Sequence, residues 1–246
     1  MTMETNNQHI KWHNDVLIKQ LISYLVGVCM GRYRLDKPGL HIAYPNPSAE
    51  DLASYDYHGE EIKIDDDGII PLMPSACPFN DNMLRRLVDL IRIVFGGDSL
   101  IDNLNFMEKA LGKSLEQYLL KDFWKDHKKM YQNRPIYWLF SSKKGAFQCI
   151  AYMHRMNAWT AERVRTKYLL PYIDFLVSKQ SDMEANAANL TPQQRRELDK
   201  ITKQISECRE YHDRLHEVAD REIAFDLDDG VIVNYAKFGD VLSKIK

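Results

Sequence analysis

Apolar side chains recur every three to four residues over several stretches of this chain, which is the spacing of amphipathic helices. In the first stretch, Leu21, Leu25 and Val28 lie on one face of a helix that we predict over 14–34. A Pro-Gly pair that begins at Pro38 follows it. Because proline cannot continue a helical hydrogen-bond pattern, we expect the helix to end before this pair.

The same periodicity predicts more helices in the middle of the chain, at 80–96 and in the segment that ends at Leu111. Ser114 and Gln117 have the spacing of a capping box, which satisfies the free N–H groups at the start of a helix. We therefore predict that a further helix begins there and runs over 115–131.

The stretch 45–78 differs from these helices because it is rich in proline and carries the run Asp-Asp-Asp-Gly at 65–68. Prolines at this density exclude a long helix. Only short strands are predicted in this stretch, at 61–64 and at 67–72.

The clearest β pattern is a hairpin of two apolar runs around the turn Ser142-Lys143-Lys144-Gly145. This turn is typical of a type I turn followed by a left-handed glycine. Pairing Ser142 with Ala146 places Trp138 on the same face as Ile150. Both faces are then apolar, so we expect the hairpin to be covered on both sides. Only its tip and its two ends remain free for charged contacts.

A long helix opens at Thr191, where Pro192 and Gln194 complete a capping box with proline in the first turn. Its narrow apolar stripe predicts a coiled-coil-like arm that pairs with 158–181, in which Pro171 should cause a kink or a break. The stripe consists of Leu198, Ile201, Ile205, Cys208, His212, Leu215 and Ala219.

These elements predict a mainly α fold with a small antiparallel β element, an α+β class. The predicted parts are a flexible N-terminus at 1–13, a mixed helical and β-hairpin body at 14–156, a helical hairpin at 157–223, and a C-terminal strand and tail at 224–246, with the strand at 230–235, packing on the body.

Charge is distributed unevenly, although the formal net charge is only −2. The segment 50–67 carries eight acidic residues and one lysine, whereas 121–167 carries eleven basic and three acidic residues among many aromatics. A basic, aromatic segment is typical of a surface that attracts nucleic-acid phosphates. The alternative is that the lysines solubilise one face of an aromatic core. The DNA-binding candidates are Lys128, Lys129, Arg134, Lys143, Lys144, Arg155, Arg163, Arg165 and Lys167.

No catalytic, cofactor-binding or metal-binding motif is recognisable. The chain lacks a P-loop, G-x-S-x-G, H-E-x-x-H and G-x-G-x-x-G. His212 and His216 have metal-ligand spacing, but no third ligand is evident. The acidic runs at 65–68 and 228–230 favour turns over calcium loops. Four cysteines without metal or disulfide spacing, and a polar N-terminus, indicate a cytoplasmic protein.

Three stretches resemble the C-terminal part of the BREX (bacteriophage exclusion) adenine-specific DNA methyltransferases, the PglX family. They are LISYLVGVCMGRYRLDKPGL at 21–40, FWKDHKKMYQNRPIYWLF and its continuation at 123–173, and AFDLDDGVIVNYAKFGDVL at 224–242. The resemblance implies a bacterial phage-defence system that methylates adenine in host DNA. It also implies that S-adenosylmethionine and a catalytic N-P-P-Y motif belong to a region upstream of the matched part. This chain has neither site, so no catalytic residue is carried over.

Two roles follow from the resemblance. The first is a non-catalytic domain that contacts double-stranded DNA through the basic segment, braced by the arm against the methyltransferase domain of the same enzyme. The second is an interaction domain that docks the catalytic half or other BREX proteins without touching DNA. An unrelated stand-alone enzyme is the third alternative, although no motif favours it. No membrane partner is expected.

Overall fold

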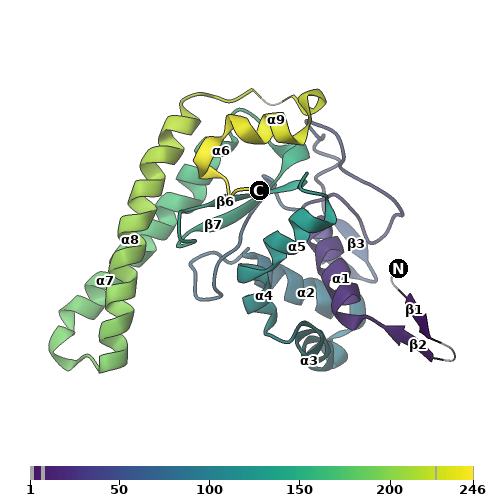
Figure 1. Ribbon diagram of the computed structural model, residues 1–246, viewed down its shortest axis with the longest axis horizontal. Helices are drawn as coiled ribbons and strands as arrows, with labels where there is room; N and C mark the ends of the chain where they lie inside the picture. The colour runs from purple at the N-terminus through teal and green to yellow at the C-terminus, as the bar shows by residue number, and fades with distance from the viewer. Residues whose placement is uncertain (1–2, 7–8, 225, 246) are drawn as a thin grey trace.

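A computed structural model describes residues 3–6, 9–224 and 226–245 of the chain. The fold is mainly helical with small antiparallel sheets, which confirms the predicted class (Figure 1). None of the described helices is long and apolar enough to cross a bilayer. A group of helices packs beside the central sheet, and consists of α1 (Asn14–Cys29), α2 (Met83–Phe95), α3 (Leu100–Leu111), α4 (Leu115–Lys121) and α5 (Phe123–Met130).

Two of the predicted helices end earlier than expected. α1 stops at Cys29 because the chain turns back at Gly31, whose φ of +78° is left-handed. A side chain at Gly31 would overlap Ile42 and Ile64, so only glycine allows this close approach. The helix predicted over 115–131 is divided at Asp122, which binds Lys113 at 2.6 Å.

Ser114 confirms the predicted start of α4, since its hydroxyl accepts a 3.1 Å hydrogen bond from the Gln117 N–H. It occupies the position that helices favour for an N-cap.

The central sheet is antiparallel and has the strand order β5 (Ile69–Pro71), β7 (Gln148–Tyr152) and β6 (Tyr137–Ser141). Residues 137–140 and 149–152 are all buried, which confirms that both faces of the hairpin are covered. The predicted register is wrong by one residue, because Phe140 pairs with Cys149 and not with Gln148. Trp138 therefore lies across from Ala151 instead of Ile150.

The outer edge of β6 is covered by α5 and by the C-terminal tail. His127 of α5 accepts a 3.2 Å hydrogen bond through Nε2 from the Tyr137 N–H. The Ser243 N–H donates to the Leu139 carbonyl at 2.8 Å, and Leu242 forms a β-bridge with Phe140. These contacts occupy backbone groups that would otherwise pair with another chain.

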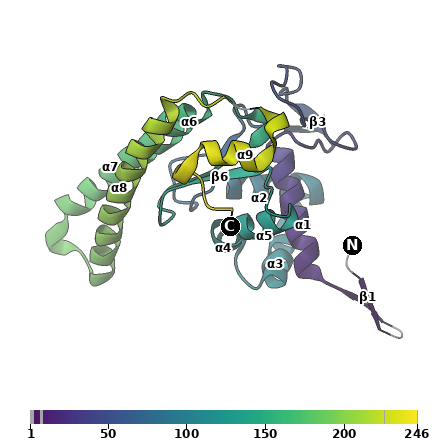
Figure 2. The ribbon, with the colours of Figure 1, turned by 45° about the horizontal axis from the view of Figure 1, so that its top comes forward.

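The helical hairpin lies along one side of the body (Figures 1 and 2). Its first limb contains a π-helical segment immediately before Pro171, which confirms the interruption expected there. The capping box at Thr191 is also confirmed. The hairpin consists of α6 (Thr160–Arg163), the π-helical η3 (Val164–Leu169), α7 (Leu170–Ala185) and α8 (Pro192–Ala219).

Only the outer part of this hairpin projects from the molecule, because the second half of α8 packs on the body. The Tyr211 hydroxyl donates to the Val241 carbonyl at 2.7 Å, and its ring contacts that of Phe147. The buried face of α8 therefore packs on α7, on the hairpin turn at Phe147 and on the C-terminal tail at Val241.

The strand predicted at 230–235 is wrong, since this segment forms the helix α9 (Gly230–Lys237). Its β-branched residues favour a strand, but Asn234 donates to the carbonyls of Asp226 and Gly230, and Tyr235 packs on Trp138 at 5.0 Å. These tertiary contacts outweigh the local preference.

Short strands also occur outside the central sheet. β1 (Met3–Asn6) pairs with β2 (His9–Trp12) in the part of the chain that we expected to be flexible, and β3 (Tyr55–Tyr57) pairs with β4 (Glu60–Ile62). The segment predicted as a strand at 61–64 thus begins one residue earlier and ends at Ile62.

Candidate nucleic-acid interface

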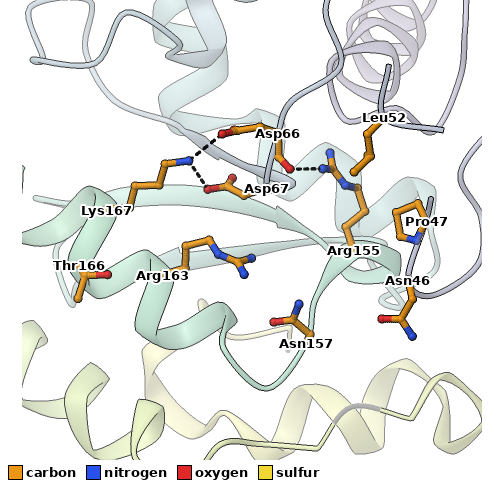
Figure 3. A pocket seen from close by; sticks show the side chains of 10 residues that line it. All are labelled: Asn46, Pro47, Leu52, Asp66, Asp67, Arg155, Asn157, Arg163, Thr166 and Lys167. Carbon is orange, nitrogen blue, oxygen red and sulfur yellow. Dashed lines mark hydrogen bonds and ion pairs between the residues drawn. The ribbon is translucent and has the colours of Figure 1, made fainter. Parts of the chain in front are cut away.

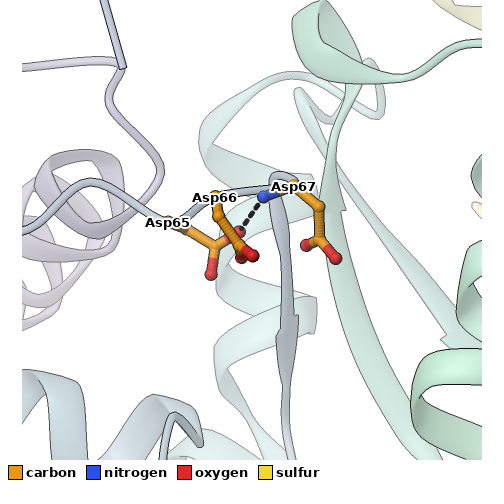
Figure 4. A group of neighbouring side chains, drawn as sticks. All are labelled: Asp65, Asp66 and Asp67. Carbon is orange, nitrogen blue, oxygen red and sulfur yellow. Dashed lines mark hydrogen bonds between the residues drawn. The ribbon is translucent and has the colours of Figure 1, made fainter. Parts of the chain in front are cut away.

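The acidic run at 65–67 forms a tight turn at the start of β5 (Figure 4). The buried Asp65 carboxylate accepts N–H groups of Asp67, Gly68 and Ile69 through Oδ1, at 2.5–3.1 Å. Its Oδ2 pairs with Arg86 at 2.8 Å. Burial raises the pKa of the Asp65 carboxyl, and the Arg86 guanidinium opposes this shift.

Carboxylate oxygens of these three aspartates lie within 4.8 Å of one another. The Asp67 carboxylate already accepts hydrogen bonds from the protein. The donors are the Tyr168 hydroxyl at 3.1 Å and the Lys167 ammonium at 2.8 Å. The hydrogen bonds to the backbone confirm that the run builds a turn. The second acidic run behaves similarly, since the Asp226 carboxylate accepts from the Asp228 N–H at 2.9 Å.

Four of the nine candidate cations have charged groups that are engaged within the molecule. Arg155 is only 8% exposed, and its guanidinium donates to the carbonyls of Asp65 at 2.6 Å and Asp66 at 2.8 Å. Lys167 bridges the carboxylates of Asp66 and Asp67. The acidic and basic segments of the sequence therefore partly neutralise each other.

The other two engaged cations bind different parts of the fold. The Lys128 ammonium donates to the carbonyls of Lys244 and Ile245, at 2.9 and 3.1 Å, and so holds the C-terminal tail. Burial lowers the pKa of Lys128, and nearby Lys125 adds to this shift. Arg165 forms a double hydrogen bond with Glu162 and contacts His212 at 3.1 Å.

The remaining candidates have side-chain charges that no hydrogen bond or ion pair engages within the described ranges 3–6, 9–224 and 226–245. Arg163 is partly exposed and the others are exposed. They are Lys129, Arg134, Lys143, Lys144 and Arg163.

These unpaired cations are not gathered at one point. Lys129 and Arg134 lie near the first end of β6, and Lys143 and Lys144 form the tip of the hairpin beyond its other end. The five residues of β6 between them span roughly 16 Å at the usual rise of a strand. This distance is about half a helical turn of duplex DNA.

Glu207 of α8 holds the tip of the hairpin. Its Oε1 accepts hydrogen bonds from the Ser142 hydroxyl at 2.6 Å, the Lys144 N–H at 2.6 Å and the Ala146 N–H at 3.3 Å. Sequence reasoning missed Glu207, because α8 carries many exposed acidic residues and no local pattern distinguishes this one.

A polar cavity of about 670 Å³ lies beside the acidic turn (Figure 3). Arg155, Arg163 and Lys167 are predicted site residues, whereas Asn157 and Thr166 are not. No sequence pattern indicated these two polar side chains, since the loop around Pro47 completes the cavity from a distant part of the chain. The residues lining it are Asn46, Pro47, Leu52, Asp66, Asp67, Arg155, Asn157, Arg163, Thr166 and Lys167.

No protein-family model matches the chain. It is 41% identical over 263 aligned positions to the adenine-specific methyltransferase BrxX of Escherichia coli O9:H4 (strain HS), which covers 99% of this chain and 22% of the relative. It is 35% identical over 236 positions to the adenine-specific methyltransferase PglX of Lacticaseibacillus casei (strain Zhang), which covers 89% of this chain and 19% of that relative. The chain thus spans about a fifth of the length of these curated relatives, and it belongs, as a homologous segment, to the BREX PglX family of adenine-specific methyltransferases.

Proposed function

We propose that this chain is a non-catalytic, DNA-engaging segment of an adenine-specific DNA methyltransferase in a BREX phage-defence system. The observation that carries the proposal is the set of unpaired cations in the basic segment, from Lys129 to Arg163. Within the described residues, the fold leaves these charges without protein partners while it neutralises their neighbours. Names of the relatives supply the substrate class, because both are adenine-specific methyltransferases.

The chemistry of methyl transfer is assigned to the rest of the enzyme. This sequence contains no N-P-P-Y string and no recognisable S-adenosylmethionine site. Lysines and arginines without further base-reading geometry bind DNA phosphates, which gives affinity that depends on salt and carries little sequence information. The segment would therefore hold the duplex while another part of the enzyme reads and methylates adenine.

A titration of the chain with unrelated duplexes at two salt concentrations tests this function. We expect binding at low salt that weakens steeply as salt rises, with a slope of about −0.9 per phosphate contact in a plot of log K against log salt. Absence of binding at low salt would contradict the proposal.

Docking of the catalytic half is the second candidate function, and one surface favours it. Ile232 and Val233 of α9 are 49% and 53% exposed, and Ile232 borders a groove of about 950 Å³ between α9, the hairpin tip and the C-terminal tail. An exposed apolar patch of this kind is typical of a protein interface. Under this alternative, the chain would bind the separately produced remainder of a BrxX-like enzyme and would not bind DNA.

A further inference from the structure

The cavity beside the acidic turn has two walls that come from distant parts of the chain. One wall is the turn at 65–67 with the loop around Pro47, and the other is the segment from Arg155 to Lys167. Its volume of about 670 Å³ is in the range of small-molecule and cofactor sites. We call it the Arg163 cavity.

Most of the charge that lines the Arg163 cavity is satisfied by the protein. Lys167 lies between Asp66 and Asp67 at 3.0 and 2.8 Å. Arg155 donates to the main-chain carbonyls of Met30, Asp65 and Asp66. Three cations therefore line the cavity against two carboxylates. The surplus positive charge belongs to Arg163, whose guanidinium is the one left unengaged among the lining residues that the structure describes.

Asn157 offers a second free donor to the same space. Its Oδ1 accepts the Trp159 N–H at 3.1 Å, which orients the amide, and no hydrogen bond engages its Nδ2 group within the described residues. Figure 3 shows the Arg163 guanidinium and the Asn157 amide both turned toward the space between the walls. Two unpaired donor groups thus converge on a cavity that has a net positive lining.

We propose that the Arg163 cavity binds a phosphate group, with Arg163 as its main ligand and Asn157 as a second hydrogen-bond donor. Guanidinium groups match phosphate oxygens through two parallel N–H bonds, so an unpaired arginine in a polar cavity suits this ligand. The inference rests on the proposed function where the phosphate belongs to DNA. It stands alone where the phosphate belongs to a free nucleotide.

A metal cation fits the cavity less well than an anion does. The Asp67 oxygens already accept from Lys167, Tyr168 and Ile69, and the Asp66 Oδ2 accepts from Lys167. A cation would have to displace Lys167 and face the free guanidinium of Arg163. Electrostatic repulsion from Arg163 opposes that arrangement.

The test compares the wild-type chain with Arg163→Gln, and uses Lys109→Gln as a control. Lys109 is exposed and lies on α3, outside the cavity lining and the basic segment. Because no hydrogen bond or ion pair engages the Arg163 side chain within the described residues, we expect both variants to keep the wild-type melting temperature. Duplex affinity is measured over a range of salt concentrations, and binding of inorganic phosphate and of AMP is followed by NMR.

For a DNA phosphate, Arg163→Gln should weaken duplex binding by about tenfold at low salt and reduce the salt slope by about 0.9, whereas Lys109→Gln leaves both unchanged. For a free nucleotide, the wild type should bind AMP and inorganic phosphate, and Arg163→Gln should abolish this binding while duplex affinity stays the same.

If Arg163→Gln changes neither duplex binding nor phosphate binding, the cavity assignment is wrong. The proposed function would survive that result as long as the wild-type chain binds duplex with a steep salt slope. If the wild-type chain binds neither duplex nor phosphate, both proposals fail.

Discussion

Glu207 on α8 accepts a 2.6 Å hydrogen bond from the main-chain N–H of Lys144 at the tip of the β6–β7 hairpin. The same oxygen also binds the Ser142 hydroxyl and the Ala146 N–H. One carboxylate thus organises the turn, while Lys143 and Lys144 are exposed.

Replacement of Glu207 by Ala should destabilise the protein by about 1–3 kcal/mol, because it removes a charged acceptor from several donors at once. The free energy of unfolding in urea measures this change. Glu210→Ala is the matched control, since Glu210 is exposed on the same helix and its carboxylate has no hydrogen bond among the described residues. Equal stability of the two variants would contradict the role of Glu207.

The double variant Lys143→Glu/Lys144→Glu should weaken duplex binding by about tenfold or more at low salt, because the tip then repels phosphates. A control with the same change in charge is Lys37→Glu/Lys109→Glu, at exposed positions outside the basic segment. Fluorescence anisotropy with a labelled duplex measures both. Unchanged affinity of the tip variant at low salt would show that the tip does not contact DNA.

Arg155 should matter for stability more than for DNA binding. Its guanidinium satisfies the carbonyls of Asp65 and Asp66, and its side chain packs on Gly68, where an added Cβ would lie 2.9 Å from the Arg155 Cβ. Arg155→Ala leaves buried acceptors unpaired and should cost about 2–4 kcal/mol of stability. Thermal unfolding measures this cost. A variant of wild-type stability that has lost DNA affinity would instead place Arg155 among the DNA ligands.

Acid should destabilise the fold through His127. Burial lowers the pKa of the His127 imidazole to about 3, and Arg32 adds to this shift. The unfolded chain takes up a proton at this residue below about pH 6.5, whereas the folded chain does so only near pH 3. Stability is therefore lost as pH falls through this window, by up to about 1.4 kcal/mol per pH unit.

The variant His127→Gln tests this linkage, because its amide oxygen can still accept the Tyr137 N–H. Urea unfolding at pH 7 and pH 5 should show a smaller loss for this variant than for the wild type. Burial also lowers the pKa of His154, to about 4, so part of the loss should remain. An identical loss in the variant and the wild type would exclude His127 as the cause, and the exposed His58 supplies a control substitution.

Local sequence was sufficient to predict those structural features that depend on residues close to one another in the chain. The caps at Ser114 and Thr191, the interruption before Pro171 and the left-handed Gly145 were all predictable. Each depends on hydrogen bonds or steric limits within a few residues. The two apolar runs likewise predicted that both faces of the hairpin are buried.

Tertiary contacts decided the register of the β6–β7 hairpin, the helical conformation of α9 and which charged side chains are paired. The turn selected by Glu207 contains one residue more than expected, since the Ser142 N–H donates to the Phe147 carbonyl. This single residue shifts every pair along the strands.

The candidate site depends on contacts between residues that are even further apart in the sequence. Lys167 meets Asp67 across 100 residues of sequence, so a count of basic residues could not separate engaged cations from free ones. The sequence by itself determined most of the helices and the β6–β7 hairpin, because periodicity and caps act locally, whereas α9 depended on tertiary contacts. Only the folded chain determined which charges are paired, because ion pairs depend on distances in space.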